Sequence, residues 1–403
     1  MKLNSLLSIR GQLSGLCLLG LLFSPVVLPA QNTISTYAGG GKVGTTATTV
    51  DLPGPSGVIR DAAGNTYIAA PYSTYVFKLT GSTVSTFAGL GYEVFGGDGK
   101  LASKAGLDLP SALAIDTKGN IYIVDPGGSR IREVSAATGN IQTVVGSGTK
   151  CEPATATCGD GGKATAAAVG LNLPNAMALD ASGNIYIADS ADHRIRAVNM
   201  TAAAITIAGV VIQPGNIATI AGNGTICSSG TMQCGDTGTA TLASLSFPSG
   251  VAVDSQGNIY IADTRDNRIR EIAHGSSTIT AYAGSGIACV SGVSTCGDGG
   301  ALLSAQFHMP MGLFVDSSNN LYVADSFDHE VRFINVSAPS ITTVAGNGYQ
   351  GFSGDLGTAT SAQLNLPGAV FADASGNLLI ADTGNQRVRQ VSAGNITTLA
   401  GGG

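Results

Sequence analysis

The most constraining feature of this sequence is one pattern that recurs six times along its 403 residues. A clear copy reads Phe247-Pro248-Ser249-Gly250-Val251-Ala252-Val253-Asp254, then Gly257-Asn258-Ile259-Tyr260-Ile261-Ala262-Asp263, then Asn267-Arg268-Ile269-Arg270, then Ile279-Thr280-Ala281-Tyr282-Ala283-Gly284. The same frame starts at Leu52-Pro53, Leu109-Pro110, Leu173-Pro174, Met309-Pro310 and Leu366-Pro367. The chain therefore consists of repeats rather than of two or three unrelated domains.

Each repeat has the pattern of four short strands, here called a to d in chain order. Glycines such as Gly183 and Gly257 precede Asn where a tight a-to-b turn needs a positive φ. Strand b is apolar on both faces and must therefore be covered on both sides, whereas strand c alternates Arg with Ile, so only one of its faces is expected to be buried. The sequence predicts an all-β fold over residues 31–403, a six-bladed β-propeller of four-stranded antiparallel blades. The blade cores are expected at about 52–89, 109–146, 173–222, 247–284, 309–346 and 366–401.

The Pro-x-Gly-Val-Ala-Val-Asp, Gly-Asn-Ile-Tyr-Ile-Ala-Asp and Asn-Arg-Ile-Arg segments resemble the NHL repeat over nearly the whole chain. The resemblance implies a six-bladed propeller, here of an exported bacterial type. Blade one departs from the pattern, because Ala70 stands where the other copies have Asp and Val76-Phe77-Lys78 replaces Arg-Ile-Arg. An extra d-like segment, residues 34–38, precedes blade one, and either this segment or residues 396–400 is expected to close blade six.

Residues 1–30 have the pattern of a secretory signal peptide cleaved near Ala30. Lys2 and Arg10 flank an apolar run of about 15 residues, which is short for a membrane span of about 20. After residue 30, 18 Lys and Arg residues stand against 26 Asp and Glu residues, a formal charge of −8 that argues against a nucleic-acid partner. We therefore expect a secreted or periplasmic monomer with no membrane span after cleavage.

Six of the seven cysteines fall in three pairs of identical spacing, and each pair is followed by Gly-Asp. The even number, the equal spacing and the export signal predict three local disulfides, Cys151–Cys158, Cys227–Cys234 and Cys289–Cys296. Zinc binding by the cysteines is the alternative, but the sequence places no further metal ligand beside the pairs. Closing loops this short contributes about 2.5 kcal/mol each in the chain-entropy model, so the bridges are expected to stiffen loops more than to hold the fold.

Most arginines of the repeats lie on strand c, close in sequence to an Asp that ends strand b. Because these residues recur with the blade, we interpret them as an Asp–Arg network that fixes the b-to-c turn. The alternative is a ring of carboxylates for acid–base chemistry, which would have to converge on one point. His193 and His329 occupy the position of Asn267 in another copy, so a role in the turn is expected for both.

Two groups of residues break the repeat in ways that indicate binding. His308 precedes strand a, and its equivalents are expected to be Asp51, Asp108, Asn172, Ser246 and Asn365. These residues either cap the entry turn or form a polar ring at the mouth of the channel, where Asp51, Asp108 and His308 could bind a metal. In blade one, Arg60 replaces an apolar residue and Tyr72 and Tyr75 lie in the b-to-c region, which indicates an anionic or sugar-like ligand. The alternative is a degenerate blade whose Arg60 reaches solvent.

The d-to-a connections are long, at about 91–108, 147–172, 223–246, 285–308 and 347–365. Each contains a Gly-Asp element, at Asp98, Asp160, Asp236, Asp298 and Asp355, for which we expect a turn role rather than calcium binding. These connections and the b-to-c turns leave a four-stranded blade on the same face, which we predict to be the binding surface. The predicted function is an exported, non-catalytic module without a cofactor that binds an extracellular or periplasmic protein, peptide or glycan. The alternative is a metal-dependent lyase or hydrolase with its site in the channel.

Overall fold

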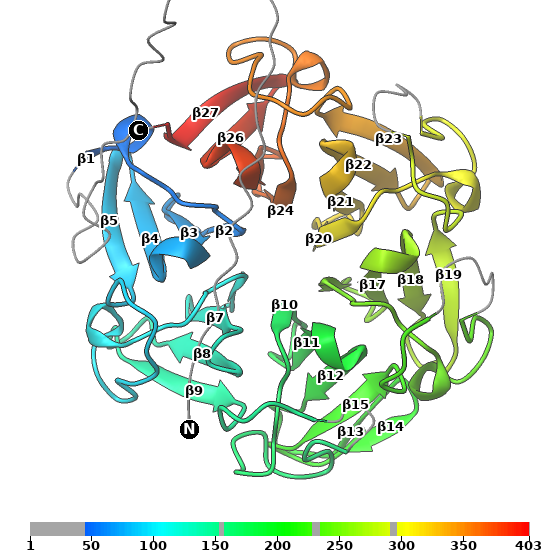
Figure 1. Cartoon of the computed structure of the whole chain (residues 1–403). Coiled ribbons are helices and arrows are strands. Elements are labelled where there is room, and N and C mark those ends of the chain that lie inside the picture. The colour runs from blue at the N-terminus through cyan, green and yellow to red at the C-terminus, as the bar shows by residue number, and fades with distance from the viewer. Residues whose placement is uncertain (1–44, 153–156, 228–233, 291–295, 403) are drawn as a thin grey trace, which may run out of the picture. The chain divides into compact units, whose positions relative to one another are not determined.

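The computed structural model describes residues 45–402 except 153–156, 228–233 and 291–295. The expected signal peptide and the d-like segment 34–38 lie outside the described residues. The described chain forms six four-stranded antiparallel blades around a central axis (Figure 1), so the predicted β-propeller is confirmed. In these ranges no helix combines the length and the apolar character that crossing a membrane requires.

Each blade is a meander whose strands a to d run in order across the sheet, with strand a nearest the axis (Figure 1). Blade one contains β2 (Gly57–Arg60), β3 (Thr66–Ala70), β4 (Tyr75–Thr80) and β5 (Thr83–Ala88). Blade two contains β6 (Leu113–Ile115), β7 (Ile121–Asp125), β8 (Arg130–Val134) and β9 (Ile141–Val145). Blade three contains β10 (Pro174–Leu179), β11 (Ile185–Asp189), β12 (Arg194–Val198) and β15 (Ile217–Ala221), and its c-to-d connection forms an extra hairpin of β13 (Ile205–Ile207) and β14 (Val210–Ile212).

Blade four contains β16 (Gly250–Val253), β17 (Ile259–Asp263), β18 (Arg268–Ile272) and β19 (Ile279–Ala283). Blade five contains β20 (Pro310–Val315), β21 (Leu321–Asp325), β22 (Glu330–Asn335) and β23 (Ser340–Ala345). Blade six contains β24 (Pro367–Ala372), β25 (Leu378–Asp382), β26 (Arg387–Ser392) and β27 (Asn395–Gly401).

Short 3-10 helices occupy two recurring positions. The b-to-c turns contain η2 (Pro71–Ser73), η4 (Ser190–Asp192), η6 (Thr264–Asp266), η8 (Ser326–Asp328) and η10 (Thr383–Asn385). The d-to-a connections contain η3 (Ala102–Lys104), η5 (Ala240–Leu242), η7 (Leu302–Ser304) and η9 (Ala359–Ser361), and η1 (Ala47–Thr49) precedes blade one. We call the side of the propeller where the b-to-c turns and d-to-a connections leave the blades the loop face.

The hydrophobic core lies between the blades, as the apolar strand b predicts. Every residue of β3, β7, β11, β17 and β25 is buried. Six clusters of buried side chains each join two neighbouring blades, and one of them packs Leu379 and Ala381 of blade six against Ile68 and Phe77 of blade one. Burial between blades therefore continues around the ring, and no blade buries its faces alone.

Strand d of blade six is β27, which pairs with β26 along its length. Residues 396–400 thus occupy the closing position that the sequence left open. On the outside of blade one, β1 (Thr45–Thr46) adds a fifth strand to β5, while the adjoining η1 contacts β27. The segment before blade one therefore ties the outer strands of the first and last blades together.

An inner ring of side-chain hydroxyl groups links every blade to the next. Each hydroxyl donates to a backbone carbonyl at the start of the neighbouring strand a: Ser56 to Ser111 (2.7 Å), Ser111 to Asn175 (3.0 Å), Ser190 to Pro248 (2.6 Å), Thr264 to Pro310 (2.8 Å), Ser326 to Pro367 (2.5 Å) and Thr383 to Pro55 (2.6 Å). The last bond joins blade six to blade one, so closure uses the same contact as the other blade boundaries.

The expected frame of blade one is wrong by two residues. In the other blades the residue before the strand-a proline has a positive φ, for example 59° at Leu109 and 50° at Phe247, and in blade one this residue is Gly54 with 58°. Leu52, which is fully buried, matches Leu107. Blade one therefore enters strand a at Gly54-Pro55, and the second Pro-containing dipeptide at Leu52-Pro53 misled the sequence alignment.

Candidate functional site

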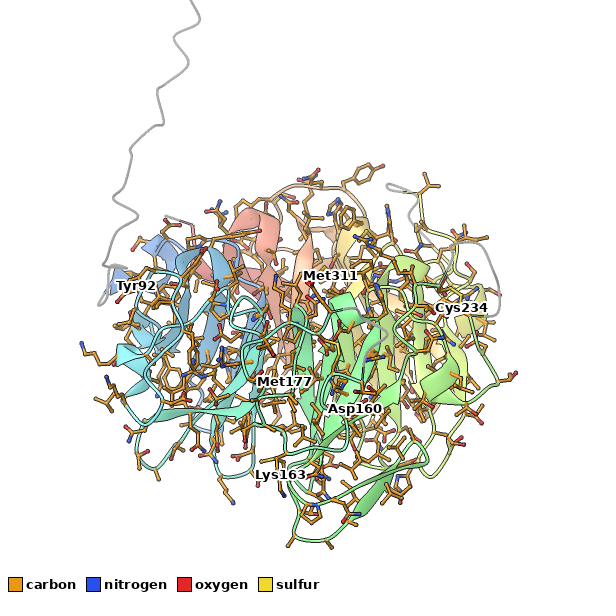
Figure 2. All side chains as sticks on the ribbon, turned by 60° about the horizontal axis from the view of Figure 1, so that its bottom comes forward. Tyr92, Asp160, Lys163, Met177, Cys234 and Met311 are labelled. Atoms are coloured by element: carbon orange, nitrogen blue, oxygen red, sulfur yellow. A yellow bond between two sulfur atoms is a disulfide. The ribbon has the colours of Figure 1, made fainter. Side chains whose placement is uncertain are left out.

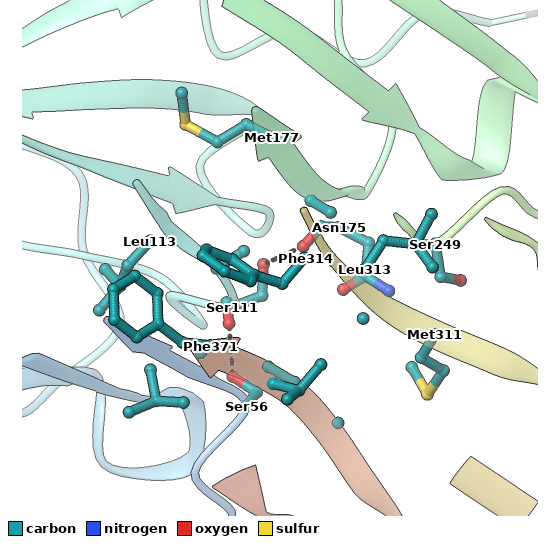
Figure 3. Close-up of a pocket in the computed structure, with 18 of the residues that line it drawn as sticks. Ser56, Ser111, Leu113, Asn175, Met177, Ser249, Met311, Leu313, Phe314 and Phe371 are labelled. Carbon is teal, nitrogen blue, oxygen red and sulfur yellow. Dashed lines mark hydrogen bonds between the residues drawn. The ribbon is translucent and has the colours of Figure 1, made fainter. Parts of the chain in front are cut away.

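A cavity of about 470 Å³ lies on the propeller axis, lined by strand a of all six blades (Figure 3). Its residues at the loop-face end include Ser56, Ser111, Asn175 and Ser249, which form a polar collar. Tyr72 and Phe327, from the b-to-c turns of blades one and five, also line it and are 66% and 40% exposed. The cavity is therefore accessible from the loop face.

The cavity wall is apolar below the collar and differs from blade to blade. Met177 and the two rings of Phe314 and Phe371 contribute to it (Figure 3), and the centroids of the rings lie 4.8 Å apart. Met311 takes the collar position in blade five. Among the described residues, the lining contains no Asp, Glu, His, Lys or Arg. The wall therefore offers hydrophobic contact and hydrogen bonds but no acid, base or metal-binding carboxylate.

The b-to-c turns and d-to-a connections also carry most of the exposed large hydrophobic side chains, although part of each d-to-a connection lies beside the c-to-d turn of the next blade, as Leu101 does beside Asn140. Of the 17 in the described ranges, all but Met200 and Val211 lie on d-to-a connections or b-to-c turns. One position recurs, directly after the Gly-x-Gly that follows strand d, and there Tyr92, Ile287 and Tyr349 are 58%, 63% and 58% exposed. Tyr92 and Cys234, on d-to-a connections far apart in sequence, both lie in the upper part of the propeller in Figure 2. We call the exposed side chains of Tyr92, Ile287 and Tyr349 the rim triad.

The proposed metal ligands Asp51, Asp108 and His308 do not come together. None of the three lines the axial cavity, and in the described part of the chain they do not form a group whose ligand atoms lie close to one another. The backbone N–H groups of Asp108 and His308 donate to Asp125 and Asp325 at 2.6 and 2.8 Å. Asp108 and His308 therefore cap the turn that enters strand a, which was the alternative to a metal-binding ring.

Asp51 has no place in the expected polar ring because of the corrected frame. Its position in blade one belongs to Pro53, which has no N–H group to donate. The strand-b residue that would accept this hydrogen bond is Ala70, so the missing donor and the missing carboxylate compensate each other. This pairing accounts for the loss of the strand-b Asp in blade one.

Arg60 is not available to a ligand and does not reach into solvent. Its guanidinium binds Asp373 (2.9 Å) and Gln390 (3.2 Å) of blade six and Thr66 (3.2 Å) of its own blade. Although burial opposes it, hydrogen bonds from Asn377, two backbone N–H groups and Arg60 lower the pKa of Asp373. Both alternatives for Arg60 are therefore wrong, because the side chain connects the first blade to the last.

Tyr72 and Tyr75 also separate in the structure. Tyr72 lines the mouth of the axial cavity, whereas Tyr75 begins strand c, packs beside Phe77 with ring centroids 5.5 Å apart, and does not line the cavity. Of the three residues expected to recognise a ligand in blade one, only Tyr72 lies at a cavity in the described ranges.

The expected Asp–Arg network is confirmed, with one partner that the sequence did not reveal. In blade three, Arg196 is fully buried and binds Asp189 of strand b (3.3 Å) and Asp160 of the d-to-a connection (2.6 Å). The expectation that only one face of strand c is buried is therefore wrong, because ion pairs allow the arginine face to be buried as well. The equivalent arginines bind equivalent pairs: Arg132 with Asp125 and Asp98, Arg270 with Asp263 and Asp236, Arg332 with Asp325 and Asp298, and Arg389 with Asp382 and Asp355. The Gly-Asp aspartates are thus ion-pair partners and not only turn residues.

Burial dominates the electrostatics of this network. It raises the pKa of Asp125 to about 7 and that of Asp263 to about 6, because loss of water outweighs the attraction of Arg132 and Arg270. These carboxyl groups recur in five blades and point into the blades rather than into the axial cavity. The raised pKa values therefore come from the burial of aspartates that belong to structural ion pairs, and they do not mark a catalytic site.

The three predicted disulfides are present, with Cα atoms 5.4 to 5.7 Å apart. A buried Asp of the b-to-c turn lies against each pair, namely Asp192, Asp266 and Asp328. The sequence placed no ligand there, so this neighbour was missed, but sulfur atoms joined in a disulfide are not the thiolates that zinc binds. In blades two and six, which lack the cysteines, Phe95 and Phe352 instead cover the strand-c arginines.

The histidines of the b-to-c turns have the structural role expected from the repeat. His193 and His329 adopt positive φ values of 52° and 55°. Each Nδ1 accepts the backbone N–H of the next blade, from Phe247 (3.2 Å) and Leu366 (3.1 Å), as Asn267 Oδ1 does from Met309. Burial lowers the pKa of both histidines, assisted by Arg265 near His193 and by His308 near His329.

Sequence reasoning missed the polar collar and the rim triad. The collar could have been found, because the residue after the strand-a proline is Ser, Asn, Met or Gly in different copies, while it is always followed by Gly or Ala. The rim triad occupies a loop position whose exposure only the structure reveals.

Comparison with known proteins supports the repeat assignment. The model of the teneurin NHL domain matches residues 130–213 and 207–280. Mouse Teneurin-3 is 30% identical over 305 residues, covering 70% of this chain and 10% of that protein. The protein SUPPRESSOR OF QUENCHING 1 of Arabidopsis thaliana is 25% identical over 291 residues, covering 71% of this chain and 25% of that protein. The chain spans about a tenth of the length of the teneurins that it matches.

Two solved structures share the architecture at low identity. A structural genomics protein of unknown function from Bacteroides thetaiotaomicron has a TM-score of 0.59 at 16% identity, covering 87% of this chain and 72% of that chain. An auxiliary nutrient binding protein from the same species has a TM-score of 0.53 at 15% identity, covering 85% and 70%. The repeats, the six blades and the matched domain model together show that this chain is an NHL-repeat β-propeller.

Proposed function

We propose that the protein is an exported binding module that captures a protein partner on its loop face, without catalysing a reaction. The observation that carries this proposal is the rim triad. Tyr92, Ile287 and Tyr349 leave three different blades at equivalent positions and are all more than half exposed. Exposed aromatic and aliphatic side chains gathered on one face are typical of protein interfaces.

The chemistry of the face favours a protein over a glycan. Aliphatic residues such as Ile226, Ile287 and Val290 are exposed there beside the tyrosines, and aliphatic side chains contribute little to binding a hydroxyl-covered sugar. The disulfides and the buried ion pairs hold the roots of these loops, so the exposed side chains lose little freedom on binding. The disulfides also support export, because they persist in oxidising compartments.

The auxiliary nutrient binding protein from Bacteroides thetaiotaomicron has the same fold, but that likeness shows the fold alone. The lyase alternative receives no support, because the described lining of the axial cavity contains no residue for acid–base or metal chemistry.

Site-specific photocrosslinking tests the proposal. Benzoylphenylalanine introduced at Tyr92 or Tyr349 should crosslink to a discrete partner in the extracellular fraction of the source organism. The same probe at Val211, an exposed residue of the β13–β14 hairpin outside the loop face, should not. An excess of unlabelled protein should abolish the crosslink, whereas an excess of the variant with Tyr92→Asp, Ile287→Asp and Tyr349→Asp should not.

Three results would contradict the proposal. Equal crosslinking from Val211 would show non-specific contact, and competition by the triple variant would show that the rim triad is not the binding surface. Selective retention of the protein by a polysaccharide, with no protein crosslink, would assign the face to a glycan.

A further inference from the structure

We propose that the axial cavity binds a neutral, largely aromatic small molecule that carries a hydrogen-bonding group at one end. This site is distinct from the rim triad and goes beyond the proposed function. Its volume of about 470 Å³ lies in the range of about 300–1,000 Å³ that small-molecule sites occupy.

The lining excludes a charged ligand. No Asp, Glu, His, Lys or Arg lines the cavity in the described part of the chain, so a buried carboxylate, phosphate or ammonium would lack an opposite charge. Burying an unpaired ion costs far more than the hydrophobic contacts of a small ligand contribute. The ligand must therefore be neutral.

The shape of the wall favours a flat aromatic body. Phe314 and Phe371 occupy equivalent positions on β20 and β24, where blades two, three and four carry Ala114, Ala178 and Ala252. All five residues line the cavity. Identical repeats would give a symmetric channel, whereas here two aromatic rings face three alanine methyl groups, with Ile59 at the sixth equivalent position. This asymmetry leaves a space beside two ring surfaces, which suits an aromatic ligand.

The collar determines where the polar end of the ligand lies. The hydroxyl protons of Ser56 and Ser111 are donated to backbone carbonyls, so their oxygen atoms remain able to accept hydrogen bonds. The side-chain amide of Asn175 supplies donors and an acceptor at the same level. A ligand with a hydroxyl or amide at one end can therefore satisfy the collar while its aromatic body contacts Phe314 and Phe371.

Two dyes with the same aromatic body test the inference that the ligand must be neutral. N-phenyl-1-naphthylamine is neutral, and 1-anilinonaphthalene-8-sulfonate adds a sulfonate to it. The neutral dye should bind the purified chain at one site, with a fluorescence increase that saturates, and the sulfonate should bind at least roughly tenfold more weakly. Ala178→Phe, which fills the cavity, should weaken binding of the neutral dye by roughly tenfold or more, while the control Leu242→Phe, at an exposed residue of η5 that does not line the cavity, should not.

Methionine methyl resonances give a readout that needs no variant. The methionine methyl groups of the protein are labelled with ¹³C for this experiment. Met177 and Met311 line the cavity, whereas Met200 is exposed outside it. The neutral dye should shift the first two signals with the same saturation curve as the fluorescence and leave Met200 unchanged. The proposal is overturned if the neutral dye does not saturate, if both dyes bind equally, or if Met177 and Met311 do not respond.

Discussion

Arg60 and Asp373 form an ion pair that connects the first blade to the last, and its contribution can be measured. The two groups lie 2.9 Å apart with side chains only 16% and 13% exposed, and Gln390 and Thr66 also accept from Arg60. Fully exposed ion pairs contribute about 0–1 kcal/mol, and shielded hydrogen bonds to a charged group about 1.5–3 kcal/mol. We expect Arg60→Met to lower the free energy of unfolding by about 2 kcal/mol.

The loss stays moderate because neither partner is stranded in an apolar environment. Without Arg60, the carboxylate of Asp373 still accepts hydrogen bonds from the Asn377 side chain and from the backbone of its own turn. A double-mutant cycle with Asp373→Asn should therefore give a coupling free energy of about 1 kcal/mol, smaller than the effect of Arg60→Met alone. Arg60→Lys should recover only part of the loss, because an ammonium cannot reach both Asp373 and Gln390 in the same planar geometry.

Urea unfolding followed by far-ultraviolet circular dichroism measures these changes, since the chain has no tryptophan. Arg265→Met is the matched control, because Arg265 is exposed and stacks on Phe247 without an ion pair in the described chain; its effect should stay within about 0.5 kcal/mol. A coupling free energy below about 0.3 kcal/mol, or an equal loss in the control, would refute the assignment of Arg60 to ring closure.

Three further perturbations test other parts of the structure. Burial lowers the pKa of His193 and His329 below 6.5, so the unfolded chain binds protons that the folded chain refuses, and each histidine lowers the stability as the pH falls from about 6.5 to the folded pKa. The raised pKa values of Asp125 and Asp263 act in the opposite direction, so the histidine contribution is measured as a difference: urea unfolding should show the wild type losing stability relative to His329→Asn between about pH 7 and 5, and an unchanged difference would contradict this. Replacing Cys227 and Cys234 by Ser should lower the free energy of unfolding by at most about 2.5 kcal/mol and increase proteolysis only in that connection, and global unfolding at room temperature would contradict a local role. Thr383→Val removes the hydroxyl bond that joins blade six to blade one and should cost about 1–2 kcal/mol, against a change below about 0.5 kcal/mol for the exposed Thr225→Val.

The fold could be predicted from the sequence because six copies of one pattern can be compared with one another. A single Gly-Asn dipeptide is weak evidence for a turn, but the same dipeptide before strand b in five of the six blades indicates the turn and the strand boundaries together. The glycines Gly64, Gly119, Gly183, Gly257 and Gly376 all have φ between 79° and 88°, and Asn319 takes the same role at 66°. Apart from the start of blade one, the predicted blades, turns and disulfides accordingly match the structure.

Contacts between distant segments could not be predicted in the same way. The partner of Arg196 at Asp160 comes from the preceding d-to-a connection, and the partner of Arg60 at Asp373 is at the other end of the chain. The first contact could have been predicted from spacing, because the strand-c arginine follows the Gly-Asp aspartate by 34 residues in four of the five blades. Arg60 occurs once, so no repeat could reveal its partner.

The departures from the repeat fall into two kinds, and the difference indicates where function lies. Pro53 and Ala70 depart together, since one lacks a donor and the other lacks the acceptor, and such a compensated pair preserves the blade. The asymmetric wall of Phe314 and Phe371 and the exposed rim triad have no compensating partner in the described chain. Packing of the blades requires neither feature, because other copies pack with alanine or isoleucine at the wall position and with threonine at the rim position. A feature that the scaffold does not need, and that exposes apolar surface to water, is best explained by what it binds.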